Sequence, residues 1–357
     1  MPAATRPTVS TSISILLAAG ACSGGSPTTT ANASETSTAA STTSAASTAT
    51  SSTSSSTSPP TTTSSTDATA STASTAASST GDETTTGGPL TRCPTIAAPI
   101  KTGTLADPAI AEASGLAASR SQPGVLWTHN DSGDEARVFA IDPAGSTLGA
   151  FVLEGVSAID WEDIALGPGP TPGEWLYVGD IGDNLSARRS VTVLRAPEPK
   201  VDGMGGTATL AGVEAIELTY PDGAHDAETL LIDPPTGDLF IVAKGEPTRV
   251  FRRPGPLLAG GPFPLDEVLP VAAPITFATA GDVSPLGDFV ALRGYFQGAL
   301  WIRPPGGDLA QAFATSPCAL SLAVEVQGEA LAIAADGKGY TTVSEMGAQP
   351  LWFFAFE

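Results

Sequence analysis

The sequence predicts an all-β domain, which we interpret as a five-bladed β-propeller that begins near residue 91. Three observations lead to this prediction. Short apolar runs bounded by turn-forming residues recur along the chain, a short segment repeats at intervals near 50 residues, and a partial module stands at each end of the repeat. Modules of this length with several strands each are typical of propellers.

The apolar runs are short and are bounded by Gly, Pro, Asp and Asn, as in domains made of many short antiparallel strands. Helical patterns are scarce. The runs are Val125–Thr128, Val138–Ile141, Trp175–Val178, Val191–Leu194, Leu239–Ala243, Phe289–Leu292, Leu300–Ile302, Tyr340–Val343 and Leu351–Phe356.

The repeated segment begins with an oxygen-bearing residue, continues with mostly apolar residues, and ends in a turn. Its copies follow one another at intervals of 48, 66, 51 and 50 residues, and each is followed closely by a second apolar strand. The copies begin at Ser114, Glu162, Glu228, Thr279 and Glu329. The long second interval predicts a surface insertion around Pro197–Ala211, rich in Gly and Pro; the alternative is a sixth blade hidden there.

The two ends of the repeat each supply about half a module. The residues after Glu329 form one half, and residues 92–113 supply the other. We therefore expect the ends to complete one blade together, with Lys101–Leu105 as its outer strand. A ring closed in this way has no exposed sheet edge.

The first 22 residues are typical of an export signal. Arg6 precedes an apolar stretch, Ile13–Ala21, that is too short to cross a bilayer, so residues 1–21 are predicted to be a signal peptide. The small residues before Cys22 resemble the lipobox of bacterial lipoproteins, although Ala19 stands where leucine is usual. The resemblance implies lipidation of Cys22 and anchoring to a membrane. The alternative is cleavage near Ala21 and release of a soluble protein.

Residues 22–90 are predicted to be a disordered stalk. Beyond Cys22 they are almost wholly Ser, Thr, Ala, Gly and Pro, without an aromatic residue, Lys or Arg, and such a segment cannot bury enough apolar surface to fold. Residues 91–357 remain for the folded domain. A stalk behind a lipid anchor predicts a lipoprotein of the bacterial cell envelope, on the outer membrane or the cell surface.

Cys93 and Cys318 are the remaining cysteines. In an exported protein an even pair predicts one disulfide, which here would attach the closing strand to the preceding blade. The alternative is two unrelated buried thiols.

The chain is strongly acidic, with 37 Asp and Glu against 16 Lys and Arg and a net charge of −21. The sequence contains no basic patch, which excludes nucleic acid as a direct partner. An acidic excess suits cation binding. We expect a monomer whose partner is an envelope protein, a glycan or a small phosphate-bearing ligand.

The first residues of the repeated segments predict a metal site. In a propeller the innermost strands line the central channel, so Ser114, Glu162, Glu228, Thr279 and Glu329 should form a ring. Carboxylates so close repel one another unless a cation lies among them, and an oxygen-only set favours a hard ion, Ca²⁺ first. Alternatively, the acids accept hydrogen bonds from backbone amides of a neighbouring blade. Flanking acids are Glu112, Asp160, Asp163, Asp226 and Asp282.

The order Ser, Glu, Glu, Ser/Thr, Glu, one residue per blade, resembles the central calcium site of the calcium-activated nucleotidase (apyrase) family of five-bladed propellers. Thr279 stands where that family has serine. The resemblance implies Ca²⁺ at these five positions and hydrolysis of nucleoside di- and triphosphates, and it identifies no catalytic residue. The chain is also similar to propeller-like lipoproteins of high-GC bacteria that have no assigned activity.

The second strands end in a further polar set, predicted to surround one mouth of the channel. Its members are Asp131, Asp180, Lys244, Arg293 and Glu345. Lys244 and Arg293 predict a pocket for an anion such as phosphate; the alternative is salt bridges around the rim. Two Asp-rich fragments, Asn130–Asp134 and Asp180–Asn184, resemble parts of calcium loops, with ordinary loop structure as the alternative.

Two functions follow from these observations. The first is a non-catalytic envelope module that binds a protein or glycan through a propeller face. The second is a calcium-dependent phosphohydrolase acting on nucleotides or other phosphate esters. The sequence has no nucleophile motif and only two histidines, and the fold alone does not decide between the two.

Overall fold

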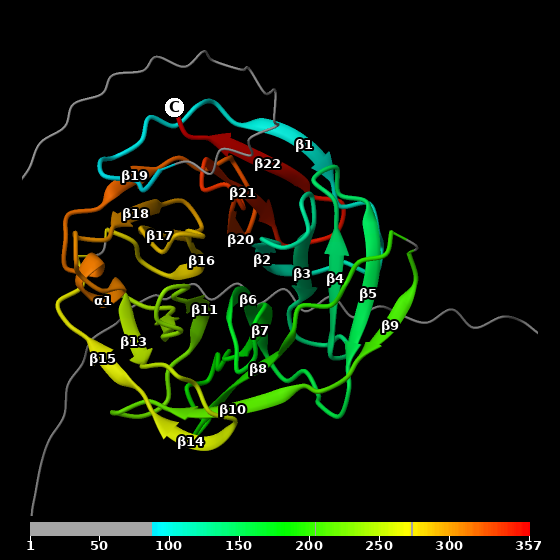
Figure 1. Ribbon diagram of the computed structural model, residues 1–357, viewed down its shortest axis with the longest axis horizontal. Coiled ribbons are helices and arrows are strands. Elements are labelled where there is room, and N and C mark those ends of the chain that lie inside the picture. The colour runs from blue at the N-terminus through cyan, green and yellow to red at the C-terminus, as the bar shows by residue number, and fades with distance from the viewer. Residues whose placement is uncertain (1–87, 204, 273) are drawn as a thin grey trace, which may run out of the picture. The chain divides into compact units, whose positions relative to one another are not determined.

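The computed structural model describes residues 88–203, 205–272 and 274–357. These residues form five β-sheets arranged as a five-bladed propeller (Figure 1). The predicted fold class and number of blades are confirmed. The predicted signal peptide, Cys22 and nearly all of the predicted stalk lie outside the described residues. Within the described ranges, no helix is both long enough and apolar enough to cross a membrane.

Blades 1 and 2 each contain five strands, numbered here by the order of their innermost strands in the chain. Blade 1 has the order β2 (Ala113–Ala118), β3 (Leu126–Asn130), β4 (Arg137–Ile141), β5 (Thr147–Leu153) and β9 (Thr207–Leu210). Blade 2 has the order β6 (Trp161–Pro168), β7 (Glu174–Asp180), β8 (Val191–Pro197), β10 (Glu214–Thr219) and β14 (Gly260–Pro264).

Blades 3, 4 and 5 each contain four strands. Blade 3 consists of β11 (Ala227–Ile232), β12 (Leu239–Ala243), β13 (Arg249–Arg253) and β15 (Asp266–Val268). Blade 4 consists of β16 (Ala278–Val283), β17 (Phe289–Gly294), β18 (Gly298–Ile302) and β19 (Cys318–Leu320), with the short helix α1 (Leu309–Phe313) before β19. Blade 5 consists of β20 (Gly328–Ile333), β21 (Gly339–Ser344), β22 (Pro350–Ala355) and β1 (Ile100–Thr104).

The long interval of the repeat contains an added strand rather than a sixth blade. β9 lies in the chain between β8 and β10 of blade 2, yet it pairs in parallel with β5 of blade 1. One blade later, β14 lies between β13 and β15 of blade 3 and pairs in parallel with β10 of blade 2. Each of these segments therefore covers the outer edge of the preceding blade.

The core lies between the blades, in five apolar clusters that each draw on two neighbouring blades. Successive residues of a strand point to opposite faces of its sheet. On β20, accordingly, Ala330 and Ala332 pack toward blade 1, and Leu331 and Ile333 pack toward blade 4. Burial on both faces explains why the innermost strands are apolar almost throughout.

The ring closes as the sequence predicts. β1 pairs with β22, so a strand from the start of the domain completes the C-terminal blade. The predicted disulfide between Cys93 and Cys318 is present, with a Cα–Cα distance of 5.5 Å. It joins the segment before β1 to β19 of blade 4. The first and last segments of the domain are therefore held together both by pairing and by a covalent bond.

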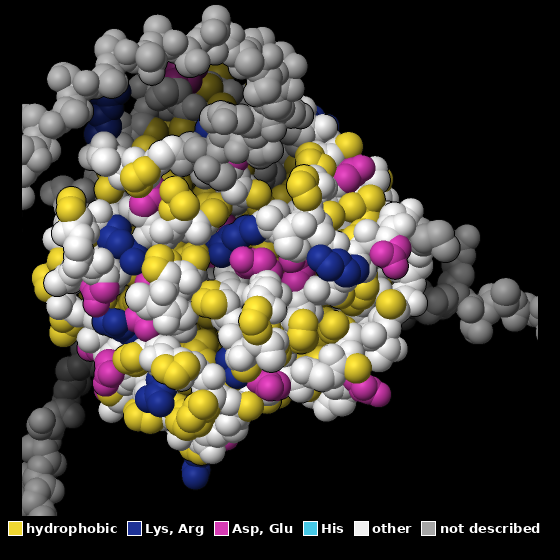
Figure 2. Space-filling view, viewed as in Figure 1, with side chains coloured by type: hydrophobic (Ala, Val, Ile, Leu, Met, Phe, Trp, Pro, Cys, Tyr) yellow, Lys and Arg dark blue, Asp and Glu magenta, His cyan; other side chains and the backbone are white. Residues whose placement is uncertain are grey.

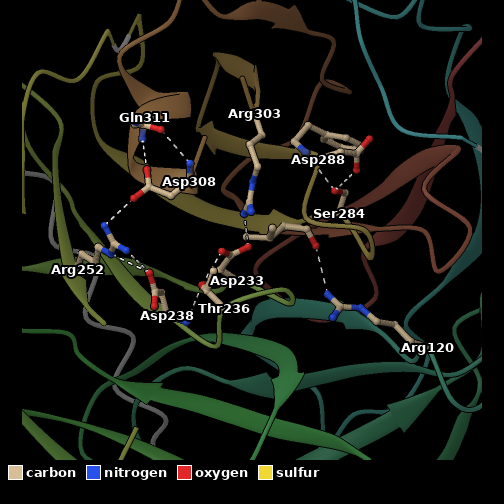
Figure 3. A network of polar contacts seen from close by, with 12 residues as sticks. Arg120, Asp233, Thr236, Asp238, Arg252, Ser284, Asp288, Arg303, Asp308 and Gln311 are labelled. Atoms are coloured by element: carbon tan, nitrogen blue, oxygen red, sulfur yellow. Dashed lines mark hydrogen bonds and ion pairs between the residues drawn. The ribbon is translucent and has the colours of Figure 1, made fainter. Parts of the chain in front are cut away.

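Polar contacts cross the channel at the end where the innermost strands finish (Figure 3). Arg120, just beyond β2, donates from Nη2 to the backbone oxygen of Val283 in blade 4 at 3.2 Å. At the same end Arg303 of blade 4 pairs with Asp233 of blade 3. Figure 2 shows acidic and basic side chains close together near the middle of one face, with hydrophobic side chains scattered around them.

Candidate metal centre

Each innermost strand begins with a β-bulge, at which one residue has no partner on the second strand. In blades 2 to 5 the unpartnered residue is the first residue of the repeated segment. These four residues are Glu162, Glu228, Thr279 and Glu329. In blade 1 the equivalent residue is Gly115, because Ser114 is paired with His129. Ser114 therefore lies one residue before the unpartnered position, whereas the repeat in the sequence aligns it with the four residues that occupy that position.

The two hydroxyl side chains of the predicted ring connect neighbouring blades. Ser114 donates from Oγ to the backbone oxygen of Glu162 at 2.6 Å. Thr279 donates from Oγ1 to the backbone oxygen of Gly328 at 2.7 Å. Both side chains are buried, so their hydroxyl protons hold blade 1 to blade 2 and blade 4 to blade 5.

Carboxylates from blades 1, 2 and 3 converge at the end of the channel where the innermost strands begin. Asp131, Asp160 and Glu162 each place an oxygen within 4.8 Å of the others, and Glu162, Asp226 and Glu228 do the same. We call these two groups the acidic triads; Glu162 belongs to both. The structure thus brings together two predicted channel glutamates, two flanking acids and one predicted rim residue.

Glu329 lies beside the triads rather than in them. Its carboxylate accepts a hydrogen bond from Tyr295 Oη of blade 4 at 3.2 Å. Tyr295 is also in contact with Lys244, whose Nζ lies 5.6 Å from the centre of its ring. The third predicted glutamate therefore meets a neutral donor instead of the other two glutamates.

The two glutamates of the triads differ in their partners. Glu228 pairs with Lys244. Glu162 is only 4% exposed, and its carboxylate accepts no hydrogen bond from any residue that the structure describes. A Cβ at Gly182 would lie 2.1 Å from Glu162 Oε1 and 2.6 Å from Asp160 Oδ2. A side chain at this position would force both carboxylates to move, because the backbone approaches them so closely.

Burial raises the pKa of each acid of the triads for which a shift is resolved, and that of Glu329 beside them, and neighbouring carboxylates raise it further. The pKa of Asp131 rises to about 7. The pKa of Glu228 also rises to about 7, although Lys244 opposes the effect of burial. Burial and Glu345 raise the pKa of Glu329 to about 8. The pKa of Glu162 lies well above its ordinary value through burial and the charge of Glu228.

Two flanking acids have a structural role instead. Asp163 Oδ2 accepts from Leu230 N of blade 3 at 3.0 Å, and Asp282 Oδ2 accepts from Ile333 N of blade 5 at 2.8 Å. Each also accepts from the amide of the residue that follows it. The alternative role foreseen for the channel glutamates, bonding to backbone amides of the next blade, is performed by these two aspartates.

The predicted rim residues occupy different positions in the strand register. Before the bulge, the first residue of each innermost strand is paired with a residue of the second strand. In blade 2 that second-strand residue is Asp180, and in blades 3 and 5 it is followed directly by Lys244 and Glu345. Arg293 of blade 4 is instead paired with the residue just after the bulge. Arg293 is fully buried and donates from Nη1 to Glu325 Oε2 at 2.6 Å.

Each predicted rim cation is thus engaged with a carboxylate, Lys244 with Glu228 and Arg293 with Glu325. Among the rim acids, Asp180 pairs with Arg188 at 2.7 Å. Glu345 accepts from Gln327 Nε2 at 2.6 Å. The alternative of salt bridges describes this set better than a pocket for an anion.

The Asp-rich fragments form supporting loops. Asp183 donates its backbone amide to Asp226 Oδ1 at 2.9 Å and so orients one acid of a triad. Asn130 donates from Nδ2 to Asp134 Oδ2 at 2.6 Å. The role of Gly182 was missed from the sequence, although its position inside an Asp-Ile-Gly-Asp fragment was a usable signal. Nothing in the local sequence indicated the roles of Tyr295 and Glu325.

The comparisons with known proteins add no family. No protein-family model matches the chain, and no curated protein is significantly similar to it.

We predict that the metal-free protein loses stability as the pH rises from about 5 to about 8. The raised pKa values of Asp131, Glu228 and Glu329 mean that the folded state holds more protons than the unfolded state in this window. The free energy of unfolding must then fall as the pH rises. Denaturant unfolding in a chelator, measured at several pH values, would show this slope. A flat or rising profile would contradict it.

We also predict that Gly182→Ala displaces the acids of the first triad. The added methyl would overlap Glu162 and Asp160, so the free energy of unfolding should fall by about 1–3 kcal/mol. The matched control is Gly347→Ala, because a Cβ there meets nothing within 4 Å. Equal unfolding midpoints for the two variants would show that the close approach at Gly182 is unimportant.

Proposed function

We propose that this protein is an interaction module of the bacterial cell envelope whose propeller binds a divalent cation, Ca²⁺ first, at one end of its channel. The observation that carries the proposal is Glu162, a buried carboxylate shared by both acidic triads and without a hydrogen-bond donor among the described residues. The charge on a carboxylate so buried and without a donor is costly, and either a proton or a cation relieves that cost. A cation in either triad would be shared by three carboxylates, Glu162 among them.

The donor set favours calcium over other metals. The triads offer only carboxylate oxygens, and neither contains histidine or cysteine. Ca²⁺ accepts six to eight oxygen ligands in flexible geometry, whereas Zn²⁺ favours nitrogen and sulfur. The resemblance to the calcium site of the nucleotidase family supports this choice through Glu162 and Glu228. It is weaker at Ser114 and Thr279, whose hydroxyls donate to backbone oxygens of the next blade.

A binding role is favoured over hydrolysis because the basic side chains near the channel are already paired with carboxylates. A calcium-dependent phosphohydrolase would use a cationic side chain to hold its phosphate. Lys244 is paired with Glu228, and Arg293 is buried against Glu325. We therefore propose a binding role, with nucleotide hydrolysis as the outcome that an activity test would reveal.

The envelope location is proposed from the sequence. Lipidation of Cys22 would anchor the chain, and the stalk would hold the propeller away from the membrane.

The anchor predicts that Cys22→Ser releases the protein from membranes. A single lipidated cysteine supplies the membrane affinity, and the chain without it should move to the soluble fraction of an expressing bacterium. Fractionation followed by mass spectrometry of the N-terminus checks both points. Cys93→Ser provides the control, since it removes a cysteine that forms the disulfide. A variant at Cys22 that stays in the membrane fraction would refute the anchor.

For the cation, we predict that calcium raises the melting temperature of the wild type and leaves that of Glu162→Gln unchanged. Above about pH 8 and without calcium, Glu162→Gln should be the more stable protein, because it lacks the unpaired buried charge. Thermal unfolding with added calcium or chelator measures both effects. Glu154→Gln is the control, since Glu154 is exposed and outside the triads.

Calcium titration by calorimetry and phosphate release from a panel of nucleotides complete this test. If the wild type binds no calcium, the proposed cation site is wrong. Calcium-stimulated phosphate release that Glu162→Gln abolishes would instead establish the phosphohydrolase.

A further inference from the structure

Large apolar side chains are exposed at the end of the propeller that holds the acidic triads. The triad residues lie at or just before the start of an innermost strand, or just after a second strand. The loops that precede innermost strands and those that follow second strands therefore lie at this end of the propeller. Phe296 follows β17, Val324 and Val326 precede β20, and Met346 follows β21. Their exposed fractions are 86%, 103%, 70% and 46%. We call these four residues the apolar arc.

The three loops of the apolar arc are in contact with one another. Tyr295, next to Phe296, donates to Glu329 at the start of β20. Gln327, next to Val326, donates from Nε2 to Glu345 at 2.6 Å, and Glu345 N donates back to the oxygen of Gln327 at 2.8 Å. Glu345 immediately precedes Met346. The loops that carry the arc therefore adjoin one another across blades 4 and 5.

The two valines are held outward by the residue between them. Glu325 is buried, pairs with the fully buried Arg293, and accepts from Thr342 Oγ1 at 2.8 Å. Val324 and Val326, on either side of this anchored residue, are exposed. A buried ion pair costs desolvation, yet here it fixes a loop that leaves two apolar side chains in solvent. Exposed apolar groups held in this way mark an interaction surface.

The charge beside the apolar arc is negative. The basic residues in the loops at this end are Arg188, Arg189 and Lys244, and two of them are paired, Arg188 with Asp180 and Lys244 with Glu228. Glu345 lies near enough to Asp131 to raise the pKa of that residue, and Glu112 lies near enough to raise the pKa of both. One divalent ion would offset only part of the charge of the five triad carboxylates.

We propose that the apolar arc and the acids beside it bind a basic segment of a partner protein. Apolar side chains of that segment cover Phe296, Val324, Val326 and Met346, and its Lys or Arg side chains pair with Glu345 and Glu112. This inference rests on the proposed function in treating the propeller as an interaction module, and it names the chemistry of the partner. Complementary charge selects a basic segment over an acidic one, and apolar contacts supply most of the affinity.

Three synthetic peptides test the proposal with the full chain in calcium buffer. One alternates Lys and Leu, the second has Glu in place of Lys, and the third has Ser in place of Leu. The Lys-Leu peptide should bind, more weakly as salt is added, and the other two should bind at least about tenfold more weakly. Equal or tighter binding of the Glu-Leu peptide would overturn the proposal.

Paired variants separate the apolar arc from general attraction to an acidic protein. Val324→Ser with Val326→Ser should weaken the Lys-Leu peptide at least about tenfold. Ile100→Ser with Leu258→Ser is the control, because these side chains are 61% and 62% exposed outside the arc. Equal losses in the two double variants would refute the arc as the binding surface.

Calcium calorimetry on the same proteins distinguishes this proposal from the cation site. The valine variant should bind calcium as the wild type does. Calcium binding by the wild type without discrimination among the peptides refutes the basic partner and leaves the cation site standing. Discrimination among the peptides without calcium binding refutes the cation site alone.

Discussion

The β-bulge at the start of each innermost strand is the constraint on which the site depends. It leaves one residue per blade without a partner on the second strand, near the start of the innermost strand. Glutamate at this position in blades 2, 3 and 5 brings negative charge into a buried ring. Gly182, Lys244 and Tyr295 then each accommodate one glutamate in a different way, by leaving space, by supplying charge and by donating a hydrogen bond.

Acids one or a few residues beyond the bulge have the opposite role. Asp163 and Asp282 are also buried, but each accepts two backbone amides, one of them from a neighbouring blade. Hydrogen bonds from amides stabilise a buried carboxylate and hold the ring together. Among the described residues, none donates such a hydrogen bond to the carboxylate of Glu162. The contrast between adjacent residues, Glu162 and Asp163, separates the structural acids of the channel from the acids that could hold a cation.

The fold could be predicted from the sequence because period, strand length and ring closure all leave local traces. The run after Glu329 and the residues before Ser114 were visibly two halves of one blade, and Cys93 with Cys318 agreed with that closure. The register could not be predicted, because a bulge shifts pairing by one residue without changing the apolar pattern. That shift separates Ser114 from the glutamates. Glu325 was also missed, since its partner Arg293 lies 32 residues away in another blade.

The same buried pair links the channel to the exposed surface. Arg293 lies on β17 between the core of blade 4 and the loop that enters blade 5, and it also donates to the backbone oxygen of Ala330 at 3.3 Å. A Cβ at Gly328 would overlap Arg293, so the chain just before Glu329 is packed directly on the guanidinium. Arg293 thus holds both Glu329, beside the triads, and the loop of the two exposed valines. The loop of the exposed valines and the strand that carries Glu329 are therefore built on one buried charge.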